Sequence, residues 1–197
     1  MYPSLVPLIF FSIAAAFTPG PNNIIGSYSG FNFGIKKSIP LILGVTFGYT
    51  TLITLSAGGL NVIFSAYPIL KTIIKILGSL FLIYLAYKIA TASKPDTNQQ
   101  NKAKPITFIQ AAAFQWVNPK AWTMALTAIS VYSPSQQIES IAIVALVFGI
   151  VNLPSVSLWA VLGQQLSKIL SSHSRLRVFN FTMAGLLLMS LYPVINP

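Results

Sequence analysis

The stretch TPGPN (Thr18–Asn22) shapes this fold, because it interrupts an apolar run that extends from about Pro3 to Ile25. A helix needs about 20 mostly apolar residues to cross a membrane. Proline lacks the N–H that a helix requires and clashes with the carbonyl four residues earlier, and glycine adds backbone freedom. We therefore predict a transmembrane helix that breaks near its middle and restarts after the prolines.

A second break, NPK (Asn118–Lys120), interrupts the apolar run from about Thr107 to Tyr132. Four further runs are long enough to cross a membrane: about Ser38–Leu60, Pro68–Ala90, Gln137–Gly163 and Val178–Ile195. Because the apolar residues are continuous and do not alternate at every second position, these runs predict helices. The expected fold is an all-α membrane protein with about six transmembrane helices.

The composition points the same way and narrows the functions open to the chain. Of its 197 residues, 54% are hydrophobic and 7% are charged, whereas a soluble domain carries about 25% charged residues. With no cysteine, one histidine and two acidic residues, disulfides are excluded and a metal site is not expected. The spans hold no cluster of acid, base and nucleophile, so we expect neither a cofactor nor an enzyme.

The net charge of +10 reflects membrane topology and not nucleic-acid binding. Nine of the twelve basic residues lie in loop regions that share one face if there are six spans: Lys36, Lys37, Lys88, Lys94, Lys102, Lys104, Lys168, Arg175 and Arg177. Basic loops stay in the cytoplasm. We therefore expect a multi-pass protein with both termini outside.

The chain also divides into two similar halves, residues 1–92 and 107–197, joined by a polar cytoplasmic loop at 93–106. Besides the two breaks, GSLFLIYLAY (Gly78–Tyr87) resembles GLLLMSLYPV (Gly185–Val194). Because each half has an odd number of spans, the second half must be inserted upside down, as in many secondary transporters. We predict a single transporter domain over 1–197, built from two inverted three-helix repeats.

The breaks carry the candidate binding residues. A restarting helix presents free N–H groups and a positive dipole end, which favour an anion such as a carboxylate. Thr18 and Asn118 are suitable N-cap residues and each precedes a proline, while carbonyls freed by the prolines can accept from an ammonium group. The breaks thus predict a site for a zwitterion, and the alternative is a purely structural proline kink.

Lys120 lies deep in the fourth span, where a charge costs about 2.5–3.5 kcal/mol on insertion scales. It therefore faces the interior or water, and either binds a carboxylate or pairs with backbone carbonyls as a structural cation. Further polar residues of the spans either line a path or join helices by hydrogen bonds: Asn23, Tyr49, Gln115 and Asn152. Gly44 and Gly48 predict close helix packing.

Three motifs, FTPGPNN (Phe17–Asn23), GVTFG (Gly44–Gly48) and FQWVNPKAW (Phe114–Trp122), resemble in this order the LysE/RhtB family of amino-acid exporters. The doubled asparagine is most similar to cysteine/O-acetylserine exporters. The resemblance implies proton-driven export across the bacterial cytoplasmic membrane and a homodimer. It assigns substrate binding to the matched positions Thr18, Pro19, Gly20, Pro21, Asn22, Asn118, Pro119 and Lys120.

Many family members carry an acidic residue where this chain has Tyr49, which implies a different proton coupling or substrate range. We therefore predict a secondary exporter of amino acids or small derivatives. The alternatives are a passive channel or facilitator, and a structural membrane subunit that transports nothing.

Overall fold

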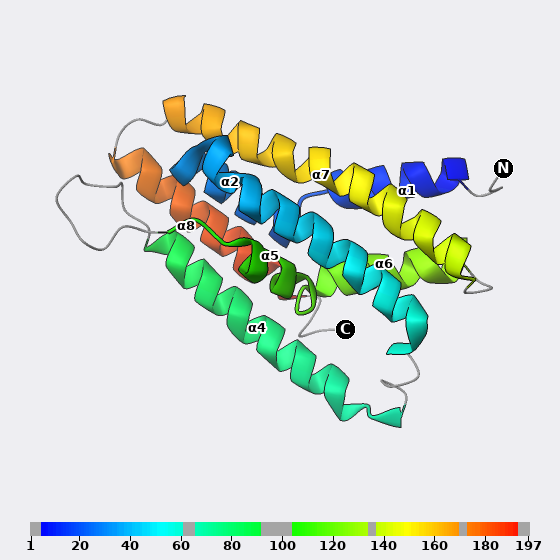
Figure 1. The fold of residues 1–197 in the computed structure, drawn as a ribbon. Helices are drawn as coiled ribbons and strands as arrows, with labels where there is room; N and C mark the ends of the chain where they lie inside the picture. The colour runs from blue at the N-terminus through cyan, green and yellow to red at the C-terminus, as the bar shows by residue number, and fades with distance from the viewer. Residues whose placement is uncertain (1–4, 61–65, 92–103, 134–136, 170–172, 193–197) are drawn as a thin grey trace.

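The computed structural model describes residues 5–60, 66–91, 104–133, 137–169 and 173–192, and within these ranges it is helical with no strand (Figure 1). Its elements are α1 (Leu5–Phe17), α2 (Pro21–Leu55), the π-helical turn η1 (Ser56–Leu60), α4 (Ile69–Ala90), α5 (Phe108–Gln115), α6 (Pro119–Tyr132), α7 (Ile138–Ile169) and α8 (His173–Met189). The predicted all-α class is confirmed for these residues. Most of the predicted loop at 93–106 lies outside the described residues.

Three helical segments are long and apolar enough to cross a membrane, namely Pro21–Gly59, Thr72–Ala90 and Ile138–Ile169. The outer surface is apolar as well, since Phe10 is 69% exposed and Ile150 is 72% exposed. Large exposed apolar areas are rare on soluble monomers. The structure is therefore that of an α-helical membrane protein.

Helix α2 folds back on itself at Gly34, whose φ of 78° and ψ of 166° are not helical. The hydroxyls of Ser29 and Ser38 form a 2.7 Å hydrogen bond across this point, although nine residues of straight helix would place them about 13 Å apart along the axis. The first broken span therefore continues to Phe33, beyond the predicted end at Ile25, and the second begins at Ile35.

Helix α7 lies along both arms of α2 (Figure 1). A Cβ added at Gly30 would lie 1.8 Å from the Ala160 carbonyl oxygen, and one added at Gly163 would lie 2.1 Å from that of Ser27. The backbones of α2 and α7 are thus in direct contact, as small residues allow in membrane helices.

The predicted packing role of Gly44 and Gly48 is confirmed. A Cβ at Gly44 would lie 2.4 Å from the Phe108 carbonyl oxygen, and one at Gly48 would lie 2.5 Å from that of Ala112. The second arm of α2 therefore packs closely against α5, the short helix that precedes the second break.

The buried side chains form two main apolar clusters, and both broken spans pass from one cluster to the other. In the first span, Leu8 belongs to the cluster around Phe148, while Ile24 belongs to the cluster around Leu82. In the fourth span the order is reversed, since Phe114 belongs to the Leu82 cluster and Ala121 to the Phe148 cluster. The two breaks thus occur where the chain crosses between the clusters, in opposite directions.

Candidate functional site

The first break separates α1, which ends at Phe17, from α2, which begins at Pro21. The prediction that Thr18 is the N-cap is wrong, because the N-cap is Gly20 with an extended backbone (φ −175°, ψ 179°) and no side-chain cap. The Thr18 hydroxyl instead donates back to the Ala14 carbonyl of α1. Threonine readily bonds the carbonyl four residues earlier, which is what withdraws it from the new helix.

Side chains replace the helical hydrogen bonds that the first break removes. The Asn23 amide donates to the carbonyl oxygens of Ala16 and Thr18, at 2.9 Å each. The Ser155 hydroxyl of α7 also donates to the Ala16 carbonyl, at 2.8 Å. Because an unpaired backbone group inside a membrane costs several kcal/mol, these bonds are what allow the break to persist.

The second break separates α5, which ends at Gln115, from α6, which begins at Pro119. Here the predicted N-cap is confirmed, since Asn118 Oδ1 accepts a 3.1 Å hydrogen bond from the Lys120 backbone N–H. The Trp122 indole N–H donates to the Trp116 carbonyl at 2.8 Å. The Trp116 carbonyl, which precedes this break, thus also accepts a hydrogen bond from a side chain.

A cluster of side-chain amides joins the two breaks. Asn22 Nδ2 donates to Gln115 Oε1 at 2.9 Å, and Gln115 Nε2 donates back to Asn22 Oδ1 at 3.0 Å. Asn118 Nδ2 donates to the same Asn22 oxygen at 3.3 Å. Gln115 and Asn118 are 0% and 1% exposed, so these two side chains are shielded from water, which strengthens their bonds to Asn22.

Lys120 links the breaks a second time. Its Nζ donates to the Thr18 carbonyl oxygen at 2.6 Å and to that of Pro19 at 3.4 Å. Of the two roles predicted for this residue, the structure shows the pairing with backbone carbonyls. Gly20 makes room for the lysine, because a Cβ there would lie 2.7 Å from Lys120 Cδ.

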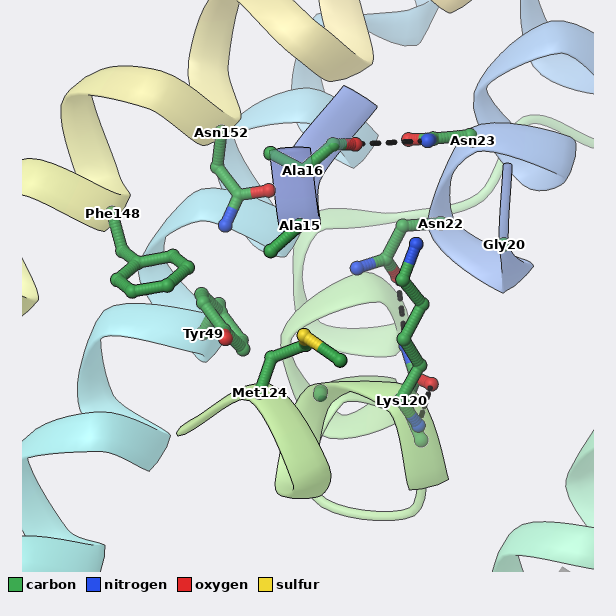
Figure 2. A pocket seen from close by; sticks show the side chains of 12 residues that line it. Ala15, Ala16, Gly20, Asn22, Asn23, Tyr49, Lys120, Met124, Phe148 and Asn152 are labelled. Atoms are coloured by element: carbon green, nitrogen blue, oxygen red, sulfur yellow. Dashed lines mark hydrogen bonds between the residues drawn. The ribbon is translucent and has the colours of Figure 1, made fainter. Parts of the chain in front are cut away.

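A cavity of about 30 Å³ lies between the two breaks, more than the roughly 10–15 Å³ that one water molecule requires. Figure 2 shows Asn22, Gly20 and Lys120 on one side of it, and Tyr49, Phe148 and Asn152 on the other. Its lining residues are Ala15, Ala16, Gly20, Asn22, Asn23, Tyr49, Asn118, Lys120, Ala121, Met124, Phe148 and Asn152.

Of the eight predicted site residues, Gly20, Asn22, Asn118 and Lys120 line this cavity. The other four shape the backbone around it: Thr18, Pro19, Pro21 and Pro119. The sequence did not single out Ser155, Met124 or Phe148, because a serine or an apolar residue inside a span is ordinary. Only their contacts with residues of distant helices distinguish them.

The match to known proteins covers most of the chain. Residues 13–191 match the family described as LysE type translocator. The chain belongs to this family. As a LysE type translocator it is a transporter and not an enzyme. The cavity between the breaks is therefore a candidate binding site for a transported molecule.

Relatives of this LysE type translocator include cysteine/O-acetylserine efflux proteins. One from Escherichia coli O139:H28 is 28% identical over 95% of this chain and 96% of its own. Another from Escherichia coli K12 is 28% identical over 89% of this chain and 90% of its own. A third, from Shigella flexneri, is 28% identical over 84% of this chain and 85% of its own. No solved structure matches the chain.

Proposed function

We propose that this protein exports an amino acid or a small amino-acid derivative across the bacterial cytoplasmic membrane, and that the molecule binds between the two breaks. The observation that carries the proposal is the contact of Lys120 in α6 with the Thr18 and Pro19 carbonyls. It brings a cation, two carbonyl oxygens that accept from side chains and a helix N-terminus to one cavity. The cysteine/O-acetylserine efflux proteins among the relatives support this class of substrate.

The arrangement suits both charges of a zwitterion. The carbonyls of Thr18 and Pro19 accept hydrogen bonds from an ammonium group, which at present is that of Lys120. A substrate ammonium takes over these carbonyls, and its carboxylate then pairs with the displaced lysine and the N-terminus of α6. Asn22 and Asn118 orient the carboxylate, while Gly20 and the prolines Pro19, Pro21 and Pro119 keep both backbones open.

The size of the cavity supports this exchange. At about 30 Å³ it holds about two water molecules and no amino acid. The Lys120 side chain occupies the space next to Gly20 that a substrate needs. Binding therefore requires Lys120 to withdraw, which couples substrate entry to a change at the contact between the breaks.

For the whole protein we propose six spans in two inverted halves, 1–92 and 107–197, with both termini outside. The opposite directions in which the broken spans cross the two apolar clusters support this arrangement. Rocking of one half against the other then exposes the site to each side in turn. We further propose drive by the proton motive force and a homodimer, both on the family resemblance.

The experiment is an export screen in cells loaded with the common amino acids, cysteine and O-acetylserine. Cells that produce the protein should excrete at least one of them faster than control cells, against its gradient, and an uncoupler should abolish the accumulation outside. Pro21→Ala and Asn118→Ala should abolish export at unchanged membrane abundance. Normal export by both variants would contradict the site, and export only down a gradient would indicate a passive facilitator.

Lys120→Ala tests whether transport uses the Lys120 ammonium group. A transporter that uses the Lys120 ammonium loses export in this variant. Export at the wild-type rate with unchanged membrane abundance would show that transport does not need this ammonium group.

A further inference from the structure

The Tyr49 hydroxyl is a buried polar group without a hydrogen-bond partner among the described residues. Tyr49 lies on the second arm of α2, is 4% exposed, and packs its ring against Phe148 with centroids 5.3 Å apart. Buried polar groups are nearly always hydrogen-bonded. Tyr49 lines the cavity between the breaks, so the missing partner can be a molecule that enters it.

Asn152 of α7 lines the same cavity and is 6% exposed. Within the described part of the chain, its side-chain amide forms no hydrogen bond, whereas the amides of Asn22, Gln115 and Asn118 are bonded to one another. Figure 2 shows Asn152 and Tyr49 on the side of the cavity opposite to Lys120. The cavity therefore has two polar ends. At the end near Lys120 the polar side chains are hydrogen-bonded within the protein, whereas at the other, which we call the free end, Tyr49 and Asn152 are not bonded to any described residue.

We propose that Tyr49 and Asn152 bind the side chain of the exported molecule and select side chains that form hydrogen bonds. This inference rests on the proposed function, in which the breaks hold the ammonium and carboxylate groups. A molecule held there directs its side chain toward the free end. The phenol can donate or accept one hydrogen bond, and the amide can do both.

The walls of the free end restrict the side chain further. Phe148, Met124 and Ala121 are apolar, and no charged residue of the described ranges lines this end. A charged side chain would be desolvated without a partner, which is costly. An aliphatic side chain would leave Tyr49 and Asn152 unpaired, and sites built from buried polar groups reject such analogues strongly. The selected class is short, uncharged and polar.

Two pairs of probes test the inference, since each pair differs by a hydroxyl in place of a methyl group. They are serine with 2-aminobutyrate, and threonine with valine. Two quantities are measured for each probe. One is how strongly the probe inhibits amino-acid export in membrane vesicles, and the other is how much it raises the thermal stability of the purified protein. The wild type should prefer the hydroxyl member of a pair, and Tyr49→Phe should reduce that preference about tenfold.

Two further variants separate recognition from folding. Asn152→Leu should reduce the same preference and serves if Tyr49→Phe does not fold. Tyr28→Phe is the matched control, because Tyr28 is a tyrosine of α2 that is 5% exposed and does not line this cavity. Its preference should equal that of the wild type.

The outcomes distinguish this inference from the proposed function. If the wild type exports an amino acid but the preference is unchanged in Tyr49→Phe and Asn152→Leu, the inference fails and the proposed function stands. The inference also fails, and the proposed function still stands, if a charged or purely aliphatic amino acid is the preferred substrate. If the wild type neither exports nor binds any amino acid, both fail.

Discussion

Lys120 Nζ donates a 2.6 Å hydrogen bond to the Thr18 carbonyl oxygen, across 102 positions of sequence. The bond joins α6, the helix that begins after the second break, to a backbone carbonyl at the first break. Hydrogen bonds from charged donors are stronger than neutral ones, and this one lies at the edge of the cavity that we assign to the substrate. It is therefore the contact whose loss should affect transport most directly.

Lys120→Met should reduce export at least tenfold, because the ammonium group serves both the empty site and the substrate carboxylate. The measurement is the rate of export from loaded cells, divided by the amount of protein in the membrane. Lys75→Met is the control, since Lys75 is exposed on α4, and its export should equal that of the wild type. Equal rates in both variants would exclude a role for the Lys120 charge.

Gly20→Ala should impair export without unfolding the protein. The backbone of Gly20 is extended (φ −175°), a conformation that alanine adopts freely. The new methyl group would lie 2.7 Å from Lys120 Cδ, and a flexible side chain can move aside at little cost. We expect a thermal midpoint close to that of the wild type and export reduced severalfold.

The control for this variant is Gly185→Ala, at a glycine of α8 whose added Cβ has no described atom beyond its own stretch of helix within 4 Å. It should leave export unchanged. A large loss of thermal stability in Gly20→Ala would contradict the prediction, because it would mean that the contact with Lys120 is rigid.

Asn22 and Gln115, whose side-chain amides bond to each other, should be energetically coupled in their contributions to stability. We expect Asn22→Ala and Gln115→Met each to lower the free energy of unfolding by about 1–3 kcal/mol, since the first leaves Gln115 Oε1 without its donor and the second leaves Asn22 Nδ2 without its acceptor. The double variant should lose less than the sum, with a coupling of about 0.5–2 kcal/mol. Thermal or chemical unfolding in detergent measures all three, and additive losses would show that the pair is not coupled.

The sequence predicted the positions of the two breaks, because a proline inside an apolar run removes a helical hydrogen bond wherever it lies. It also predicted the N-cap at Asn118, where a short amide precedes a proline. At Thr18 the same reasoning failed, since the hydroxyl donates to a carbonyl of the preceding turn instead of accepting from an N–H of the new helix. Both are local hydrogen bonds that a threonine can form, and a pattern of residue types does not rank them.

One sequence could not predict which residues of the two breaks form hydrogen bonds with each other. Asn22 and Gln115 are 93 positions apart, and their pairing depends on how α2 packs against α5. The sequence identified Tyr49 and Asn152 only as polar residues of the spans. Whether such a residue joins helices or faces a cavity depends on which neighbours surround it, and here those neighbours come from three other helices.

The contact between α2 and α7 gives a prediction about the frame that holds the site. An alanine at Gly30 would place its Cβ 1.8 Å from the Ala160 carbonyl oxygen, so the two backbones must separate. We expect Gly30→Ala to lower the free energy of unfolding by about 1–3 kcal/mol, as overpacking does in cores. Export should fall as well, because the hydrogen bond from Ser155 of α7 to the Ala16 carbonyl depends on this contact. Gly58→Ala should change neither quantity, because among the residues that the structure describes its added Cβ meets no atom within 4 Å outside the local backbone. Unchanged stability in Gly30→Ala would show that α2 and α7 are farther apart in the membrane than the contact between Gly30 and Ala160 indicates.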